Sequence, residues 1–87
     1  MKLKYNFVVQ QVDEDFVAVA VGEDASEFGG LVRMNKTGAF LFEQLRSDKS
    51  REELLTSMVE KYDAPEAVLA SNLDVFLERL EKEGVLV

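Results

Sequence analysis

The hydrophobic pattern of this 87-residue sequence changes its period once, at Asn35. Before Asn35 the apolar residues alternate, so that Val17, Val19 and Val21 lie on one side of an extended segment, with small alanines between them. After Asn35 the apolar residues recur every three or four positions. A period of two is typical of a half-buried strand, and a period near 3.6 is typical of an amphipathic helix. The chain is therefore expected to form a sheet first and helices after it, which is the α+β class.

Three strands are expected in the first part of the chain. Residues 7–12 and 16–21 flank the polar turn at residues 13–15, and together they predict a β-hairpin. An acidic loop with glycines at residues 22–30 leads to a short third strand at residues 31–34. Short connections of this kind favour a three-stranded antiparallel sheet.

Capping residues predict where the first two helices begin. Asn35 is a favoured N-cap residue, so the first helix is expected over residues 36–46. Ser50 and Glu53 have the spacing of a capping box, in which each side chain bonds the backbone N–H of the other residue. The Asn-Lys-Thr sequon that starts at Asn35 is interpreted as part of this capping and not as a glycosylation site.

The third helix is the longest, from about residue 65 to residue 82, with Pro65 in its first turn and Gly84 after its end. The stripe expected to face the core consists of Leu69, Leu73, Phe76 and Leu80. A separate ridge, centred about 100° away around the helix, consists of Val68, Asn72, Val75 and Arg79. This ridge is either the rim of the core or one wall of a groove for a partly apolar peptide. Periodicity leaves both interpretations open.

Neither cysteine nor histidine occurs in the sequence. Their absence removes disulfides, thiolate nucleophiles, Cys- or His-based zinc sites and the commonest base at neutral pH. The acidic run at residues 13–15 has neither the spacing nor the glycine of an EF-hand loop. The chain is therefore not expected to be an enzyme or to hold a metal or cofactor.

The charge and the hydropathy of the chain restrict its partners. The formal net charge of −7 at pH 7 argues against binding to nucleic acid or to anionic membranes. No apolar run approaches the roughly 20 residues of a membrane span, and no signal-peptide core follows the basic start. The expectation is a single cytoplasmic domain covering residues 1–87.

Four stretches resemble the PqqD-like proteins, a family of stand-alone recognition domains for precursor peptides. LVRMNKTGAFLFEQL at residues 31–45 is similar to the hydrophobic-Asn-x-Thr-Gly-Ala element of that family, in which a strand passes directly into a helix. SREEL at residues 50–54, EKYD at 60–63 and NLDVFL at 72–77 resemble the family's second helix, its exit and the final helix. The resemblance covers nearly the whole chain, in order.

The resemblance implies a non-catalytic chaperone for a ribosomally synthesised and post-translationally modified peptide (RiPP). In such proteins the leader segment of the precursor adds as a strand to the edge of the third strand, beside the third helix, and is delivered to a modifying enzyme. In the founding case this enzyme is a radical SAM protein and the product is pyrroloquinoline quinone (PQQ). The AFLFE run at residues 39–43 departs from PQQ-pathway members, which tend to have an Ile-Trp- or Ile-Leu-like pair. A different peptide product is therefore favoured over PQQ.

By position, the resemblance implies that the third strand and the ridge supply the peptide-binding residues. They are Leu31, Val32, Arg33, Met34, Val68, Asn72, Val75 and Arg79. Val32 and Met34 alternate onto one face of the strand, with Met34 expected in the core, and Leu31 and Arg33 alternate onto the other face. Arg33 and Arg79 are either partners for leader carboxylates or members of surface ion pairs that contribute little.

Two alternatives to peptide binding stay open. The second and third helices, joined by a tight turn beside a small sheet, look like a winged helix-turn-helix, which favours a DNA-binding regulator. The charge opposes this alternative, because residues 65–83 include five acidic and two basic side chains. The other alternative is a structural subunit or homodimer, since apolar edge strands can pair between chains.

Overall fold

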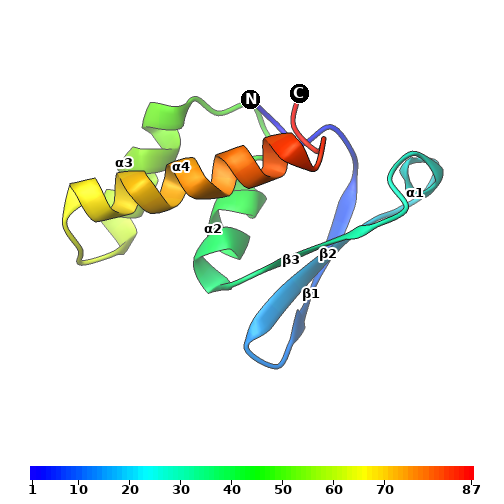
Figure 1. The fold of residues 1–87 in the computed structure, drawn as a ribbon, viewed down its shortest axis with the longest axis horizontal. Helices are drawn as coiled ribbons and strands as arrows, with labels where there is room; N and C mark the ends of the chain where they lie inside the picture. Colours follow the sequence, from blue (N-terminus) through cyan, green and yellow to red (C-terminus); the bar gives the residue numbers. More distant parts are fainter.

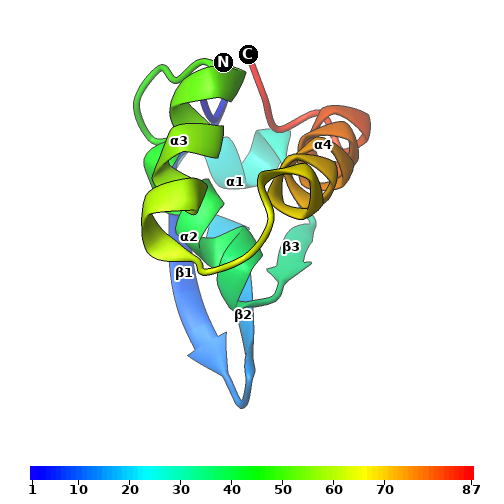
Figure 2. The same cartoon turned by 90° about the vertical axis from the view of Figure 1, so that its left-hand side faces the viewer.

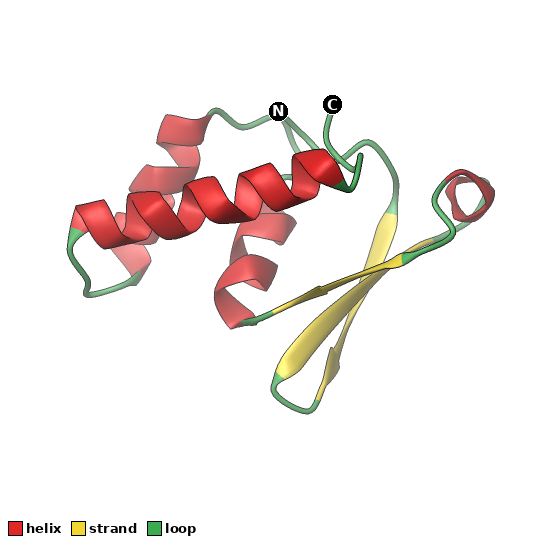
Figure 3. Cartoon of the chain, in the orientation of Figure 1, coloured by secondary structure: helices red, strands yellow, loops and turns green.

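The computed structural model describes all of residues 1–87 and contains one sheet and four helices. The strands are β1 (Phe7–Val12), β2 (Asp15–Ala20) and β3 (Leu31–Met34), and they form an antiparallel sheet in the order β1-β2-β3. The helices are α1 (Asp24–Glu27), α2 (Lys36–Gln44), α3 (Arg51–Lys61) and α4 (Glu66–Lys82). Figure 3 shows the sheet projecting to one side of the three longer helices. The expected α+β class, with a three-stranded antiparallel sheet followed by helices, is confirmed.

The connection between β2 and β3 contains a fourth helix where the sequence predicted only a loop. Residues 24–27 form the single turn α1. The Asp24 carboxylate accepts a hydrogen bond from the backbone N–H of Asn6 at 2.8 Å, and the Phe28 ring stacks on Tyr5 with ring centroids 5.8 Å apart. One turn is too short to show a helical period and too short to be stable alone. These contacts with the start of the chain therefore hold α1 in place.

Side-chain caps begin α2 and α3 as predicted. Asn35 Oδ1 accepts a hydrogen bond from the Gly38 N–H at 2.8 Å. Ser50 Oγ accepts one from the Glu53 N–H at 3.1 Å, and the Glu53 carboxylate accepts one from the Ser50 N–H at 2.9 Å. Each bond satisfies a backbone donor that has no partner within its helix. The interpretation of Asn35 as a helix cap is confirmed.

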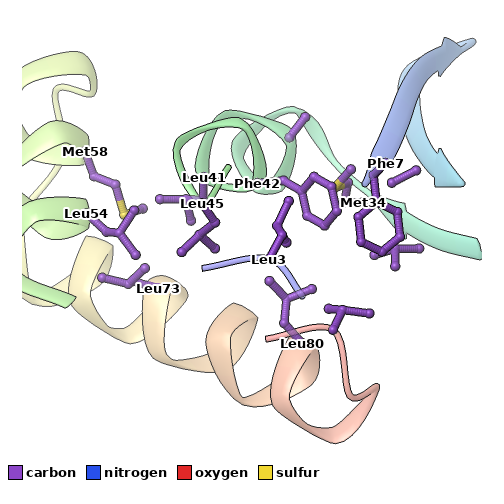
Figure 4. Close-up of a cluster of buried hydrophobic side chains, with 14 of the residues drawn as sticks. Leu3, Phe7, Met34, Leu41, Phe42, Leu45, Leu54, Met58, Leu73 and Leu80 are labelled. Atoms are coloured by element: carbon purple, nitrogen blue, oxygen red, sulfur yellow. The ribbon is translucent and has the colours of Figure 1, made fainter. Parts of the chain in front are cut away.

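One hydrophobic core joins the inner face of the sheet to α2, α3 and α4. The buried side chains labelled in Figure 4 are Leu3, Phe7, Met34, Leu41, Phe42, Leu45, Leu54, Met58, Leu73 and Leu80. Met34 is 4% exposed, so its predicted place in the core is confirmed. Full burial of a side chain of this size contributes about 1.5–3 kcal/mol, and the buried set spans every layer of the fold.

Helix α4 packs on this core through the stripe that the sequence predicted. Leu69, Leu73 and Leu80 are buried, and Phe76 is half-buried at the edge of the core. Figure 1 shows α4 crossing in front of α2 and α3 and ending near both chain termini. None of the helices is long and apolar enough to cross a membrane.

The two ends of the chain lie side by side (Figure 1). Leu3 and Leu86 form an isolated antiparallel bridge, and the Lys4 N–H donates to the Val85 carbonyl at 2.7 Å. Val85 is fully buried. The last residues therefore pair with the first ones and also cover the core below α4.

Candidate functional site

Strand β3 lies at an edge of the sheet, so one side of its backbone is free. Its register with β2 pairs Leu31 with Val19 and Met34 with Phe16. The backbone of residues 31–34 makes no hydrogen bond outside this ladder. An edge strand uses only alternate N–H and C=O groups in its ladder, and the others point outward. The outward groups of β3 are therefore available to another extended chain.

The opposite edge of the sheet, along β1, is partly occupied. Arg46 Nη1 donates to the Phe7 carbonyl at 2.9 Å. The same guanidinium bonds both carboxylate oxygens of Glu43, at 2.9 and 3.0 Å, and these bonds raise the pKa of Arg46. The arginine is thus held as a charged cap on the first residue of β1. Of the two edges, β3 is the more open.

A hollow of about 340 Å³ lies beside the end of β3, between α2 and α4. Its lining comes from β3, the start of α2 and one side of α4, and consists of Met34, Asn35, Thr37, Gly38, Leu41, Asn72, Val75, Phe76 and Arg79. Figure 1 and Figure 2 both show β3 running into α2 below α4. The hollow is therefore continuous with the free edge of β3.

The lining combines an apolar floor with a wall on α4 that is partly apolar and partly polar. Met34 and Leu41 are 4% and 1% exposed, so they form a floor that belongs to the core. On α4, Val75 is 67% exposed, and Asn72 and Arg79 place an amide and a guanidinium beside it. Apolar surface with a few placed polar groups is the usual character of a ligand site.

The close approach of three elements shapes this hollow at Gly38. A β-carbon at that position would lie 3.0 Å from Cβ of Met34 and 3.0 Å from Cε1 of Phe76. Real β-carbons rarely come so near other atoms, so the absence of a side chain at Gly38 lets α2 begin directly against β3 and α4. From the sequence, Gly38 was placed in the first predicted helix and in the family-like stretch, with no role in shaping a site.

The predicted site residues divide into two groups. Met34, Asn72, Val75 and Arg79 line the hollow. Val68, on the same ridge of α4 and 50% exposed, does not line it. On β3, Val32 is fully buried and offers only its backbone, while Leu31 and Arg33 point to the outer face of the sheet.

Five lining residues were not among the predicted site residues. They are Asn35, Thr37, Gly38, Leu41 and Phe76. The first three belong to the Asn-x-Thr-Gly element, whose residues were predicted to cap a helix and carry the family resemblance but were not predicted to bind the peptide. Phe76 was assigned to the core stripe, and its half-buried ring serves both the core and the hollow.

Arginine side chains near the site make ion pairs that are wholly or partly open to solvent. Arg33 Nε lies 3.2 Å from Asp15 Oδ2 in an exposed pair, and Arg79 Nε lies 3.4 Å from Glu83 Oε2, a buried oxygen that accepts no hydrogen bond. Surface pairs are worth about 0–1 kcal/mol. A carboxylate on a ligand can therefore compete with Glu83 for Arg79.

Comparisons with known proteins agree with this architecture. A family model described as coenzyme PQQ synthesis protein D (PqqD) matches residues 17–86. No curated protein matches the chain. Among solved structures, TbiB1 in complex with the TbiA(beta) leader peptide is 20% identical, with a TM-score of 0.75 over 99% of this chain and 94% of that chain. Lasso peptide synthetase B1 complexed with the leader peptide is 18% identical, with a TM-score of 0.68 over 97% of this chain and 93% of that chain.

At these identities the two solved structures show a shared fold. The family match is more specific, because residues 17–86 include most of β2, all of β3 and every element that lines the hollow. The chain belongs to the PqqD family, the family of coenzyme PQQ synthesis protein D.

Proposed function

We propose that this chain is a non-catalytic peptide chaperone that binds the leader segment of a ribosomally synthesised precursor peptide. The leader adds as a fourth strand at β3, and its side chains enter the hollow between β3 and α4. The observation that carries this proposal is the free backbone edge of residues 31–34, which is continuous with the lined hollow. The whole chain, residues 1–87, acts as one recognition domain in this proposal.

Backbone pairing supplies most of the recognition in this arrangement. The outward N–H and C=O groups of β3 bond the leader whatever its side chains are. Alternate leader residues face the hollow, where the apolar floor at Met34 and Leu41 favours an apolar side chain. Arg79 and Asn72 favour a carboxylate or another hydrogen-bonding group close to it. Ordering a flexible leader opposes binding, which limits the affinity.

The solved neighbours support the class of ligand. Both were determined with a leader peptide bound. Their folds cover 99% and 97% of this chain. A leader peptide is therefore the ligand class that we transfer to this protein.

A separate modifying enzyme completes the proposed role. The chain would present the bound leader to that enzyme, for which a radical SAM protein is the first candidate. The pathway is PQQ synthesis or another RiPP pathway, and the leader to test is that of the precursor peptide of this pathway.

The test is a backbone N-methylation scan of a synthetic leader peptide. Strand addition predicts that N-methylation weakens binding at every second position, because only alternate leader N–H groups point toward β3. The intervening N-methyl groups point away and leave the affinity nearly unchanged. Amide signals of residues 31–34, 72, 75 and 79 are expected to shift in NMR titrations with the unmodified leader. A scan without a period of two, or a titration that leaves these signals unchanged, would contradict the proposal.

A further inference from the structure

The sheet has a second face, which no helix covers. The register places Val8, Val19 and Leu31 in one row across all three strands, on the side opposite the core. These side chains are 47%, 47% and 56% exposed. Val17 lies on the same side of β2, and Val21 follows the end of that strand, where its N–H donates to the Asn6 carbonyl at 3.0 Å, so the two valines extend the row in both directions. We call these five residues the outer band.

Acidic residues border the outer band at both ends of the strands. Residues 13–15 form the hairpin tip at one end, and residues 23–27 follow β2 at the other end. Residues 4–36 contain six acidic side chains and three basic ones, Lys4, Arg33 and Lys36. Arg33 lies on the outer face itself, 3.2 Å from Asp15 at the hairpin tip, and Lys4 lines the same hollow as Asp24. The outer band is therefore an apolar centre whose border carries a net negative charge.

This charge pattern decides between two kinds of partner. A second copy would bring two anionic borders together on chains that each carry a formal net charge of −7, which opposes self-association. A folded protein with an apolar patch bordered by lysine and arginine would match both the centre and the border. The band also extends to Leu31 on β3, so a protein docked on it would lie next to any strand added at that edge.

We propose that the outer band docks the peptide-modifying enzyme, through an apolar patch on the enzyme that is bordered by basic residues. This inference rests on the proposed function, because the enzyme is the one that acts on the leader bound at β3. Docking on the outer face leaves the hollow open and places the enzyme beside the peptide strand. Peptide binding and enzyme docking would then use different faces of the same sheet.

The test compares two valine variants of the full chain. Val19→Lys puts a cation in the centre of the outer band, and Val59→Lys makes the same change on α3, where Val59 is 44% exposed. The probe is the purified modifying enzyme of the same pathway, and calorimetry measures its affinity. Val19→Lys is expected to weaken enzyme binding at least about tenfold, which corresponds to about 1.4 kcal/mol. Val59→Lys is expected to bind like the wild type, and both variants are expected to bind the leader normally. Wild-type affinity for the enzyme is expected to fall with added salt.

Several outcomes would overturn this inference. They are the absence of enzyme binding to the wild type, equal enzyme affinity of the wild type and Val19→Lys, or loss of leader binding in Val19→Lys. A wild-type dimer that Val19→Lys converts to a monomer in sedimentation would assign the band to a second copy instead. If the wild type fails to bind the leader while Val19→Lys still weakens enzyme binding, the proposed peptide role fails and the docking face stands.

Discussion

A β-carbon on Gly38 of α2 would lie 3.0 Å from Cε1 of Phe76 in α4. The same β-carbon would lie 3.0 Å from Cβ of Met34 at the end of β3. The missing side chain therefore sets the distance between the strand that offers a free edge and the helix that faces it. The shape of the hollow depends on this one position.

Gly38→Ala is expected to weaken leader binding and to change stability only modestly. Crowding of a packed site lowers the free energy of unfolding by about 1–3 kcal/mol. Replacing glycine with alanine within a helix raises it by about 0.5–1 kcal/mol. Phe76 is half-buried, so its ring can relieve one contact by moving into the hollow, whereas Cβ of Met34 is fixed to the backbone and requires a small shift of α2 against β3. Urea unfolding and calorimetry with the leader measure the two effects. Gly29→Ala is the matched control, since a β-carbon there meets nothing within 4 Å. Equal leader affinity of Gly38→Ala and Gly29→Ala would show that the hollow takes no part in binding.

Val75→Ala and Val68→Ala form a second matched pair. Both valines are exposed on the same ridge of α4, but only Val75 lines the hollow. Removing two carbons from a contact that becomes buried costs at most about 1.6 kcal/mol. Val75→Ala is therefore expected to weaken leader binding about fivefold, which is about 1 kcal/mol, and Val68→Ala to change it much less. Alanine is the better helix former, so neither variant is expected to lose stability. Similar losses of affinity in both would instead extend the binding wall along the whole ridge.

The difference between Val68 and Val75 illustrates how far the sequence could predict the site. Helical periodicity places the two residues on one ridge, and it correctly assigned Leu73 and Leu80 to the core. Only the arrangement of elements reveals that β3 and α2 meet α4 opposite Val75 and not opposite Val68. The close approach of Met34 and Phe76 to Gly38 could not be predicted for the same reason. A glycine within a helical pattern does not indicate which other elements pack against it.

Elements with strong local signals were predicted well, and α1 was not. The bounds of β3 and the caps at Asn35 and Ser50 depend on neighbouring residues, so the sequence was enough. The turn α1 depends on contacts with Asn6 and Tyr5, and Asn6 precedes its partner Asp24 by 18 residues, with the whole β1–β2 hairpin between them. Local periodicity contains no information about such distant contacts.

Opposite effects are expected from two substitutions in the Arg79–Glu83 pair. Arg79→Gln removes the cation of the hollow and should weaken binding of a leader that carries an acidic residue there. Glu83→Gln removes the carboxylate that competes for Arg79 at 3.4 Å, so the affinity should rise. The two charged atoms are 3.4 Å apart in a partly exposed pair, and surface pairs are worth about 0–1 kcal/mol, so each change is expected to be at most about fivefold. Calorimetry at low and high salt measures the leader affinity of both variants.

Arg79→Gln should also reduce the salt dependence of leader binding. A decrease of affinity in Glu83→Gln would show that the leader contacts Glu83 itself.

Stability is expected to fall in acid because of the link between α3 and α4. Arg51 Nε and Nη2 donate to the two carboxylate oxygens of Asp74, at 2.7 and 2.9 Å. These hydrogen bonds lower the pKa of Asp74 in the folded protein. The pair therefore adds stability above the unfolded-state pKa of an aspartate, about 4, and this contribution is lost as the pH falls through the lowered folded-state value.

Asp74→Asn removes this titrating group, so its free energy of unfolding is expected to change less with pH in the acid range than that of the wild type. Arg51→Gln removes the partner that lowers the pKa and should reduce the pH dependence by a similar amount. Since both variants break one interaction, the double variant is expected to differ little from either single variant. Urea unfolding over a series of pH values measures all four proteins. Additive effects of the two substitutions would mean that Arg51 and Asp74 stabilise the fold independently, and that the α3–α4 link makes no contribution of its own.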